Sequence, residues 1–183
     1  METPAVRIAQ PSDLRFVRSL ARTFTNQIGF IPDAATEREL HRRNILLGEL
    51  NNAEAGFLLT LPTLASQPTT AAIIQTAVHL DAQRNAVGLA LVAEAAATAK
   101  ANGALILQAW CRSDLEANDF WRAAGFAAIA ARPGGNAHAQ NHTLWRLALH
   151  ENADLRALPR DQYARAPGGK FTTREKAVHA QLT

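Results

Sequence analysis

The chain has little cysteine, few charged residues and no long apolar run. Cys111 is the only cysteine in 183 residues, so an intrachain disulfide and a cysteine-rich zinc site are both excluded. Charged residues make up 19% and hydrophobic residues 48%, which excludes wholesale disorder and predicts one folded domain with a sizeable core. No apolar run reaches the length of a membrane span, and residues 1–4 do not begin a signal peptide. We therefore expect a cytoplasmic protein with no membrane partner.

Lysine is also scarce: the chain has 3 lysines and 16 arginines, with a net charge of only +3. This bias reflects nucleotide composition or suits phosphate groups, which guanidinium binds bidentately. The arginines are dispersed rather than gathered in a basic block, so a nucleic-acid partner stays open but unsupported. Cys111 ends a predicted buried strand, and we interpret it as a small core residue rather than a nucleophile.

Apolar periodicity and turn residues predict an α+β order of elements: strand, two helices, three strands, helix, strand, helix, two strands. The expected strands are 6–9, 45–50, 56–61, 70–80, 104–111, 126–131 and 142–149. The expected helices begin near Leu14 and near Thr36 and span 86–100 and 115–124. Strand 70–80 is continuously apolar in stretches, which predicts burial on both faces.

Two details of the helix starts are specific expectations. Thr36 and Glu39 have the spacing of a capping box, which predicts that the second helix begins there. Asp114 is expected to cap the helix at 115–124.

The segment 78–90 reads as an apolar strand end, a tight turn of small residues and a helix start. The first N–H groups of a helix have no intrahelical partner, and the helix dipole adds positive potential there. This arrangement therefore predicts a site for an anion such as a phosphate.

A second segment, 114–126, carries Ala117, Trp121 and the pair Gly125-Phe126. Together with Gln83-Arg84-Asn85-Ala86-Val87-Gly88, it resembles the GNAT superfamily of N-acetyltransferases. The resemblance covers roughly residues 5–149 and implies the acetyltransferase fold, a mixed central sheet flanked by helices. It also implies acetyl-CoA as co-substrate and direct attack of a primary amine, on a small molecule or a peptide, at the thioester.

The resemblance implies which residues hold the cofactor. The family signature has Gln or Arg, two residues, Gly, one residue, and Gly or Ala, and this chain departs from it only at Ala86. We expect Ala86 in the first helical turn with negative φ, where alanine costs little. The implied cofactor-binding residues are Val78, Gln83, Arg84, Asn85, Ala86, Val87, Gly88, Leu89 and Trp121.

The acid and base of the family are not marked in this chain. Trp121 stands where the family often has a tyrosine acid, and its indole N–H cannot usefully donate a proton. The only tyrosine, Tyr163, lies outside the match. Glu49, acting through ordered water, and His79, at the strand end, are the candidate catalytic residues. Glu37, Glu39 and His41 are alternatives.

The acceptor side is expected at the apolar loop 28–32 and the polar loop 134–142. His138 and His142 in the second loop have no obvious third ligand, so no metal is expected. Two other functions stay open: a nucleic-acid-modifying transferase of this fold, and a catalytically silent CoA-binding module. A homodimer is a further expectation.

Residues 1–150 are expected to form the acetyltransferase domain, and 151–183 a C-terminal extension. The extension contains four apolar residues that the domain does not need, and these predict that it docks on the core or on a second subunit. They are Leu155, Leu158, Tyr163 and Phe171.

Overall fold

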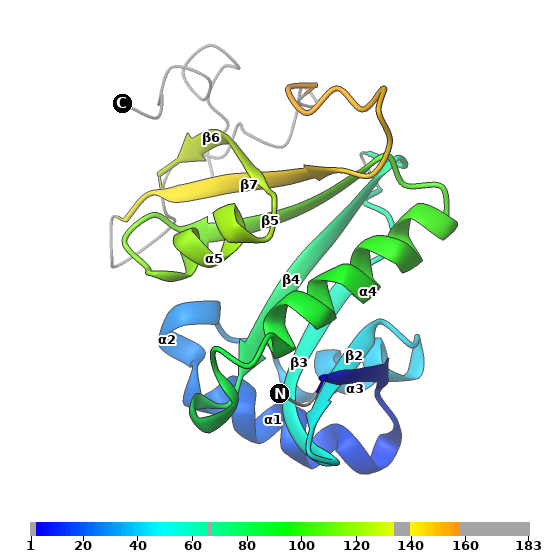
Figure 1. Cartoon of the computed structure of the whole chain (residues 1–183), viewed down its shortest axis with the longest axis vertical. Helices are drawn as coiled ribbons and strands as arrows, with labels where there is room; N and C mark the ends of the chain where they lie inside the picture. The colour runs from blue at the N-terminus through cyan, green and yellow to red at the C-terminus, as the bar shows by residue number, and fades with distance from the viewer. Residues whose placement is uncertain (1–2, 66, 134–139, 158–183) are drawn as a thin grey trace. The chain divides into compact units, whose positions relative to one another are not determined.

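The computed structural model describes residues 3–65, 67–133 and 140–157. Its strands form one mixed seven-stranded sheet flanked by helices, with the order β1-β2-β3-β4-β5-β7-β6 (Figure 1). Two compact units divide the chain: Met1–Pro62 with Ile73–Asn102, and Thr63–Ala72 with Gly103–Thr183. The predicted α+β order of elements is confirmed. No helix in the described ranges combines the length and apolarity needed to cross a membrane.

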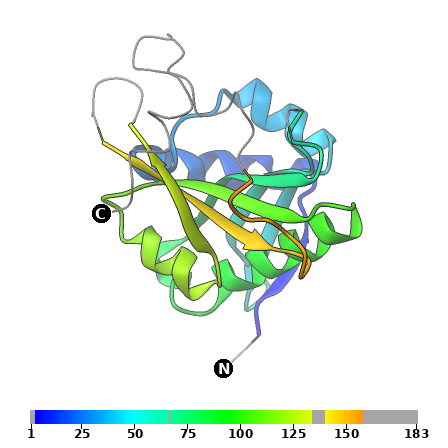
Figure 2. The same ribbon diagram turned by 90° about the horizontal axis from the view of Figure 1, so that it is seen from above.

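The first unit contains four strands and the helices that cover them. Its elements are β1 (Ala5–Ile8), η1 (Pro11–Asp13), α1 (Leu14–Thr23), α2 (Thr25–Ile28), α3 (Asp33–His41), β2 (Ile45–Leu50), β3 (Ala53–Leu61), the later part of β4 (Thr70–Val78), η2 (Leu80–Ala82) and α4 (Val87–Ala101). β1 pairs with β2 and β2 with β3, both antiparallel. Figure 2 shows α1 and α3 on one side of these strands and α4 on the other.

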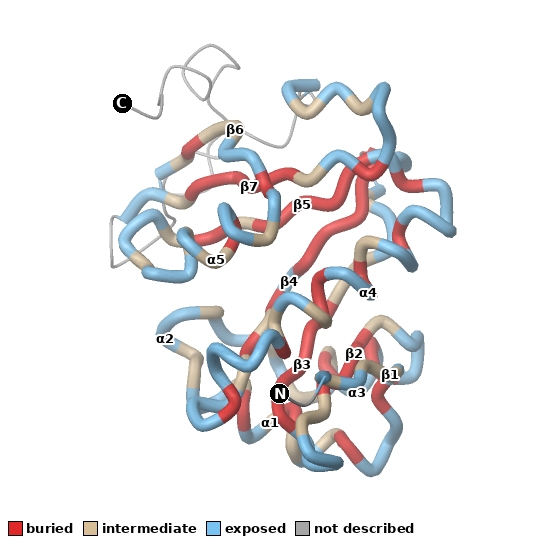
Figure 3. The backbone as a smooth tube through the Cα atoms, in the orientation of Figure 1, coloured by how far each residue is buried: buried red, intermediate tan, exposed pale blue. Residues whose placement is uncertain are grey.

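Alternation along the strands builds a core on each face of this unit. One core gathers buried residues of α1, α3 and the strands: Ala9, Val17, Leu20, Leu40, Ile45, Leu47, Phe57, Leu59 and Ala77. On the other face, a Cβ atom at Gly48 would lie 2.8 Å from Val87 Cγ1 and 3.3 Å from Leu91. The missing side chain at Gly48 therefore lets α4 approach β2 closely. Figure 3 shows the buried backbone concentrated in the strands.

The second unit contains β5 (Ile106–Arg112), α5 (Ala117–Ala123), β6 (Ala127–Arg132) and β7 (His142–Ala148). β7 pairs antiparallel with both β5 and β6. Leu144 is fully buried and packs against Trp110, Ile129 and Ala130. Cys111 is buried, as predicted for a core residue, and burial raises the pKa of its thiol.

Two helix starts differ from the sequence prediction. α3 begins at Asp33, one turn before Thr36, because Pro32 at the N-cap has a fixed φ of −58° and an extended ψ of 143°, which end the loop directly before the helix. α5 begins at Ala117, and the Asp114 carboxylate instead accepts two hydrogen bonds from Arg112, each 2.9 Å long. Asp114 therefore does not cap the helix.

The prediction that β4 is buried on both faces holds for residues 70–73, which are all buried, and is wrong for the later half of the strand. Ile73, Gln75 and Ala77 are buried, whereas Ile74 is 41% exposed and Thr76 and Val78 are half-buried. The strand ends at Val78 rather than at residue 80. One face of β4 therefore remains partly open toward its C-terminal end.

Arg146 on β7 joins the described start of the C-terminal extension to the second unit. Its side chain is fully buried, and its Nη1 donates to the carbonyl oxygens of Leu155 at 3.0 Å and Ala157 at 2.9 Å. The same guanidinium donates to Gln108 Oε1 and Gln67 Oε1. Leu158, Tyr163 and Phe171, three of the predicted anchors, lie outside the described residues.

Candidate cofactor site and catalytic groups

The turn between β4 and α4 has a left-handed backbone at two positions. Arg84 has φ of 64° and Ala86 has φ of 61°. Ala86 is the N-cap of α4, so the prediction that it lies in the first helical turn with negative φ is wrong. The backbone must reverse between the strand and the helix in a few residues, and this reversal requires conformations that favour glycine. Ala86 stands at the family's glycine position and carries strain of about 1–2 kcal/mol.

The N-terminus of α4 is open to an anion. Its N-cap makes no side-chain capping hydrogen bond, and its first turn contains no acidic residue. Residues 83–86 are exposed, Gly88 is half-buried, and α4 is 15 residues long. The first N–H groups of α4, which have no intrahelical partner, are therefore accessible to solvent at the positive end of the helix dipole. This donor set fits the phosphates of CoA, and residues 84–89 would hold them.

Side-chain amides hold the turn against the strand end. Gln83 Nε2 donates to the Val78 carbonyl oxygen at 3.3 Å, and Asn85 Nδ2 donates to the Gln83 carbonyl oxygen at 3.2 Å. Arg84 is exposed, and no described residue forms an ion pair with it. The guanidinium of Arg84 is therefore available to a phosphate. Leu89, in the first turn of the helix, is 44% exposed. Through the Gln83 side chain, the first unit thus holds the 83–86 turn next to the carbonyl of Val78.

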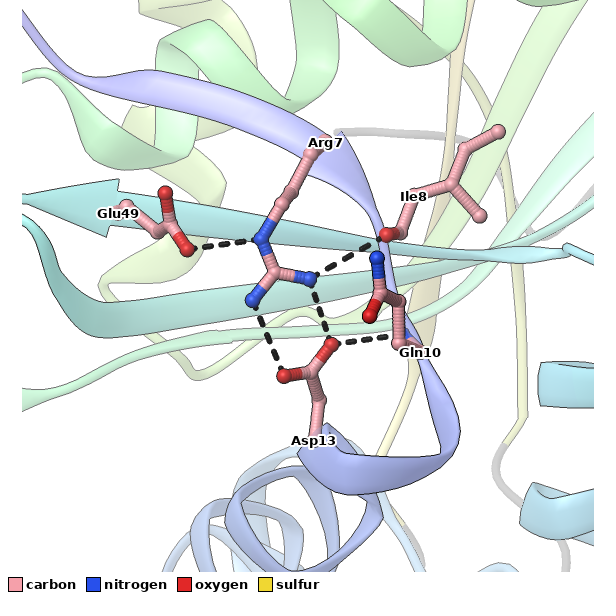
Figure 4. A network of polar contacts seen from close by, with 5 residues as sticks. All are labelled: Arg7, Ile8, Gln10, Asp13 and Glu49. Atoms are coloured by element: carbon pink, nitrogen blue, oxygen red, sulfur yellow. Dashed lines mark hydrogen bonds and ion pairs between the residues drawn. The ribbon is translucent and has the colours of Figure 1, made fainter.

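Glu49 lies in an ion-pair network at the end of β2. Arg7 Nε donates to Glu49 Oε1 at 2.8 Å, and Arg7 Nη1 and Nη2 donate to the two carboxylate oxygens of Asp13 at 2.6 and 3.0 Å (Figure 4). A β-bulge after Gly48 sets Glu49 opposite Glu54 on β3. Burial and the nearby Asp13 carboxylate raise the pKa of Glu54. Arg7 thus offsets repulsion among these carboxylates, and a base role for Glu49 would compete with this pairing.

His79 directly follows β4. Its backbone N–H donates to the Ala55 carbonyl oxygen at 2.8 Å, and its Nδ1 lies 3.7 Å from the Asp81 carboxylate. The side chain is 54% exposed, so solvent can reach the imidazole.

The alternative acidic residues are engaged on α3. Glu39 is buried and accepts hydrogen bonds from Arg38, Arg42 and Asn44, and Glu37 pairs with Arg18 at 3.2 Å. His41 belongs to a hollow of about 530 Å³ beside β1. This hollow contains no residue of the 83–89 turn. Its other lining residues are Arg7, Ile8, Ala9, Gln10, Pro11, Leu40 and Arg43.

Trp121 belongs to the second unit, where it lies on α5 and is 5% exposed. Its ring meets those of Phe120 and Phe126 edge to face, with centroids 5.1 Å apart in both cases. Gly125 follows α5 with φ of 86° and lets the chain turn so that Phe126 N–H donates to the Trp121 carbonyl oxygen at 3.0 Å. Within this unit, Trp121 is a packing residue.

Sequence reasoning missed two polar residues that organise the units. Gln75, buried on β4, donates through Nε2 to the carbonyl oxygens of Ile28 at 3.3 Å and Gly29 at 2.9 Å. Asn118, on α5, donates to the Arg112 and Leu115 carbonyls and accepts from Trp145 Nε1. A single amide within the apolar run 71–78 is the signal that could have identified Gln75.

The two acceptor-side loops differ in how much of them is described. Ile28 ends α2, and residues 29–32 connect it to α3. Phe30 in this connection is 72% exposed. Residues 134–139, with His138, lie outside the described part of the chain. Among the described residues, no three histidine, cysteine or carboxylate groups gather to hold a metal.

Known proteins match this chain by family and by fold. The acetyltransferase (GNAT) family model matches residues 14–126, so the chain belongs to this family, whose co-substrate is acetyl-CoA. A comparison with curated protein sequences finds no match.

Solved structures share the fold at low sequence identity. Ard1 from Thermoplasma volcanium superposes with a TM-score of 0.70 at 22% identity, covering 82% of this chain and 100% of that one. The yncA protein from Salmonella typhimurium, solved with its cofactor acetyl-CoA, has a TM-score of 0.68 at 18% identity, covering 86% and 100%. The ribosomal-protein-S18-alanine N-acetyltransferase from Escherichia coli has a TM-score of 0.65 at 17% identity, covering 83% and 99%. These similarities establish the GNAT fold of this chain.

Proposed function

We propose that this chain transfers the acetyl group of acetyl-CoA to a primary amine. The observation that carries the proposal is the uncapped N-terminus of α4 behind the exposed 83–86 turn. A fixed set of N–H donors at this place suits a ligand with phosphate groups. Membership of the GNAT acetyltransferase family supports the same reading.

In the proposed reaction, the neutral amine nitrogen attacks the thioester carbonyl carbon. A C–N bond forms, the C–S bond breaks, and the thiolate of CoA leaves. The amine loses one proton to a base, and the thiolate takes one from solvent, since a thiol has a pKa of about 8.5. A backbone N–H near Val78 is our candidate for stabilising the carbonyl oxygen as it gains charge.

Two side chains remain candidates for the base. Glu49 would act through water, and its bond to Arg7 keeps its carboxylate oriented. His79 is open to solvent, and an imidazole nitrogen can accept a proton from an amine. The variants Glu49→Gln and His79→Gln separate the two candidates. The variant that lacks the true base should lose the limb of the pH–rate profile that reports deprotonation of the base, and the other variant should keep that limb.

The acceptor is proposed to be an amine on a small molecule or on a peptide. Two structural neighbours, the Escherichia coli enzyme named above and a Brucella melitensis enzyme, act on ribosomal protein alanine according to their names. An α-amine is therefore a sensible first probe. The loop 29–32, with exposed Phe30, is our candidate for the acceptor side.

The test is turnover of acetyl-CoA, followed by release of free thiol, with a panel of amines. The panel holds a peptide with a free N-terminal alanine, free glutamate, lysine and a polyamine. Acetylated product from any of them supports the proposal, and thiol release without acetylated amine contradicts it. Binding of acetyl-CoA with no turnover would indicate a silent CoA-binding module. Salt-sensitive binding to DNA or RNA would favour the nucleic-acid-modifying transferase.

Three further expectations accompany this proposal. We infer a cytoplasmic location, a domain boundary near residue 150, and a homodimer as one way to cover the extension. Size measurement in solution, with and without residues 151–183, tests the last two together.

A further inference from the structure

Gln75, the only side-chain amide of β4, forms hydrogen bonds to the backbone at the end of α2. Its side chain points to the face covered by α1, as do its strand neighbours Ile73 and Ala77. Both of its hydrogen bonds go to backbone carbonyls 46 and 47 residues away in the chain. A buried amide with two such bonds fixes the distance between the strand and that backbone.

The two carbonyls that Gln75 binds close the end of α2. This helix has only four residues, and Gly29 N–H donates to the Thr25 carbonyl oxygen at 2.9 Å. The last carbonyls of a helix lack an intrahelical partner, and Gln75 supplies one for Ile28. Gly29, with φ of 79°, then turns the chain toward Phe30. Gln75 therefore sets where the 29–32 loop begins.

The same strand also holds the cofactor turn. Three residues after Gln75, the Val78 carbonyl oxygen accepts the hydrogen bond from Gln83. β4 thus forms hydrogen bonds to the start of the 29–32 loop through Gln75 and to the 83–86 turn through the carbonyl of Val78. Because both ties come from one strand, β4 would fix the position of the 29–32 loop relative to the 83–86 turn.

We propose that Gln75 is a positioning residue for the amine acceptor: it holds the 29–32 loop, and with it Phe30, in the place that acceptor binding requires. The proposal rests on the acetyl transfer proposed above. Phe30 is 72% exposed, and an aromatic ring on a fixed loop suits contact with an apolar group next to the reacting amine. A residue with this role affects acceptor binding and leaves acetyl-CoA binding unchanged.

The first arm of the test follows the loop itself and needs no substrate. Gln75→Met keeps the size and removes both donors, and Gln75→Glu places acceptor oxygens against the two carbonyls. Loss of these bonds should speed hydrogen exchange at the Gly29 amide by about tenfold. Chymotrypsin, which cleaves after aromatic residues, should cut after Phe30 faster by a similar factor.

The matched control is Thr76→Val. It removes a hydrogen bond of the adjacent residue, from Thr76 Oγ1 to the Phe57 carbonyl oxygen at 3.0 Å, on the opposite face of β4. This variant should leave both the Gly29 amide and the cleavage after Phe30 unchanged. Unchanged exchange and cleavage in folded Gln75→Met and Gln75→Glu would overturn the tie between Gln75 and the loop.

The second arm measures kinetics with whichever amine of the panel the wild-type chain acetylates fastest. In both Gln75 variants, KM for that amine should rise about tenfold while KM for acetyl-CoA stays within about twofold. Equal rises in both constants, or a loosened loop with an unchanged amine KM, would overturn the positioning role. Absence of turnover with every amine for the wild-type chain would instead contradict the proposed function, and the first arm would still decide the tie to the loop.

Discussion

The buried guanidinium of Arg146 binds the backbone carbonyl of Leu155, nine residues further along the chain, at 3.0 Å. It binds the Ala157 carbonyl in the same way and reaches Gln67 and Gln108 with its other nitrogens. The start of the C-terminal extension is therefore held by a polar contact from β7. The apolar anchors named from the sequence are not needed for this contact.

Replacing Arg146 should release this segment. Arg146→Met keeps much of the volume and removes every donor, so Gln67 and Gln108 lose a buried partner. We expect a loss of about 2–4 kcal/mol in the free energy of unfolding and faster exchange at the Ala157 amide. Urea unfolding and hydrogen exchange measure the two effects. Arg156→Met, at an exposed position in the same segment, is the control and should change neither; an unaltered Ala157 amide in folded Arg146→Met would contradict the contact.

Ala86→Gly should stabilise the chain. Ala86 has φ of 61°, which costs an alanine about 1 kcal/mol or more and costs glycine little. We expect a gain of about 0.5–1 kcal/mol in the free energy of unfolding, with acetyl-CoA binding retained. Ala90→Gly, one turn inside α4, is the control and should destabilise by about 1 kcal/mol. A loss of stability in Ala86→Gly would show that the strain has been relieved by other means.

Gly88→Glu should abolish acetyl-CoA binding. A carboxylate in the first turn of α4 would occupy the N–H donors and repel the phosphates. Calorimetry on the folded variant should detect no binding at concentrations that saturate the wild type. Ala97→Glu adds the same charge at an exposed position near the other end of α4 and should bind normally. Normal affinity in folded Gly88→Glu would refute the cofactor assignment to residues 83–89.

Trp121→Phe should keep most of the activity and its pH dependence. The ring of Trp121 is held between Phe120 and Phe126, and a phenyl ring preserves these edge contacts. We expect turnover within about threefold of wild type and a stability loss of about 1–2 kcal/mol from the smaller ring. The assay is the pH–rate profile with acetyl-CoA and the best amine. A drop of several orders of magnitude in a folded variant that still binds acetyl-CoA would make Trp121 catalytic.

The Arg7–Asp13 pair should give the chain a specific loss of stability in acid. The hydrogen bond from Arg7 lowers the pKa of the buried Asp13 carboxyl from its ordinary 3.8. Because the folded value is lower than the unfolded one, the stabilisation is complete above the unfolded pKa and disappears as pH falls through the folded pKa. Asp13→Asn should therefore flatten the stability profile below about pH 4 and cost about 1–2 kcal/mol at neutral pH, since solvent reaches Arg7.

Glu54 provides a control of opposite sign for this profile. Burial and the Asp13 carboxylate raise its pKa, so its charged form opposes folding as pH rises above the unfolded value. Glu54→Gln should gain a little stability at neutral pH and leave the acid limb of the urea-midpoint profile in place. A profile that flattens in Glu54→Gln and not in Asp13→Asn would contradict the assignment to Asp13.

Local pattern was enough to predict the order of strands and helices and the position of the turn between β4 and α4. Residues 78–90 combine a strand end, small residues and a helix start within one short segment, so their local structure can be predicted from these residues alone. β2 appears at Ile45–Leu50 as predicted, because a short apolar stretch is ended by the turn residues Asn51 and Asn52. Ala86 shows the limit of such reasoning. Composition cannot show the sign of φ at a residue where strand and helix meet.

By itself the sequence determined the family and the α+β order and located the segment proposed to bind the cofactor, because each depends on residues close together in the chain. Tertiary structure alone decided the partners of the polar side chains. Arg7 meets Glu49 across 42 residues, Gln75 meets Gly29 across 46, and Arg146 meets Gln67 across 79. A buried polar group must find a partner wherever the fold brings one, and no local pattern encodes that choice.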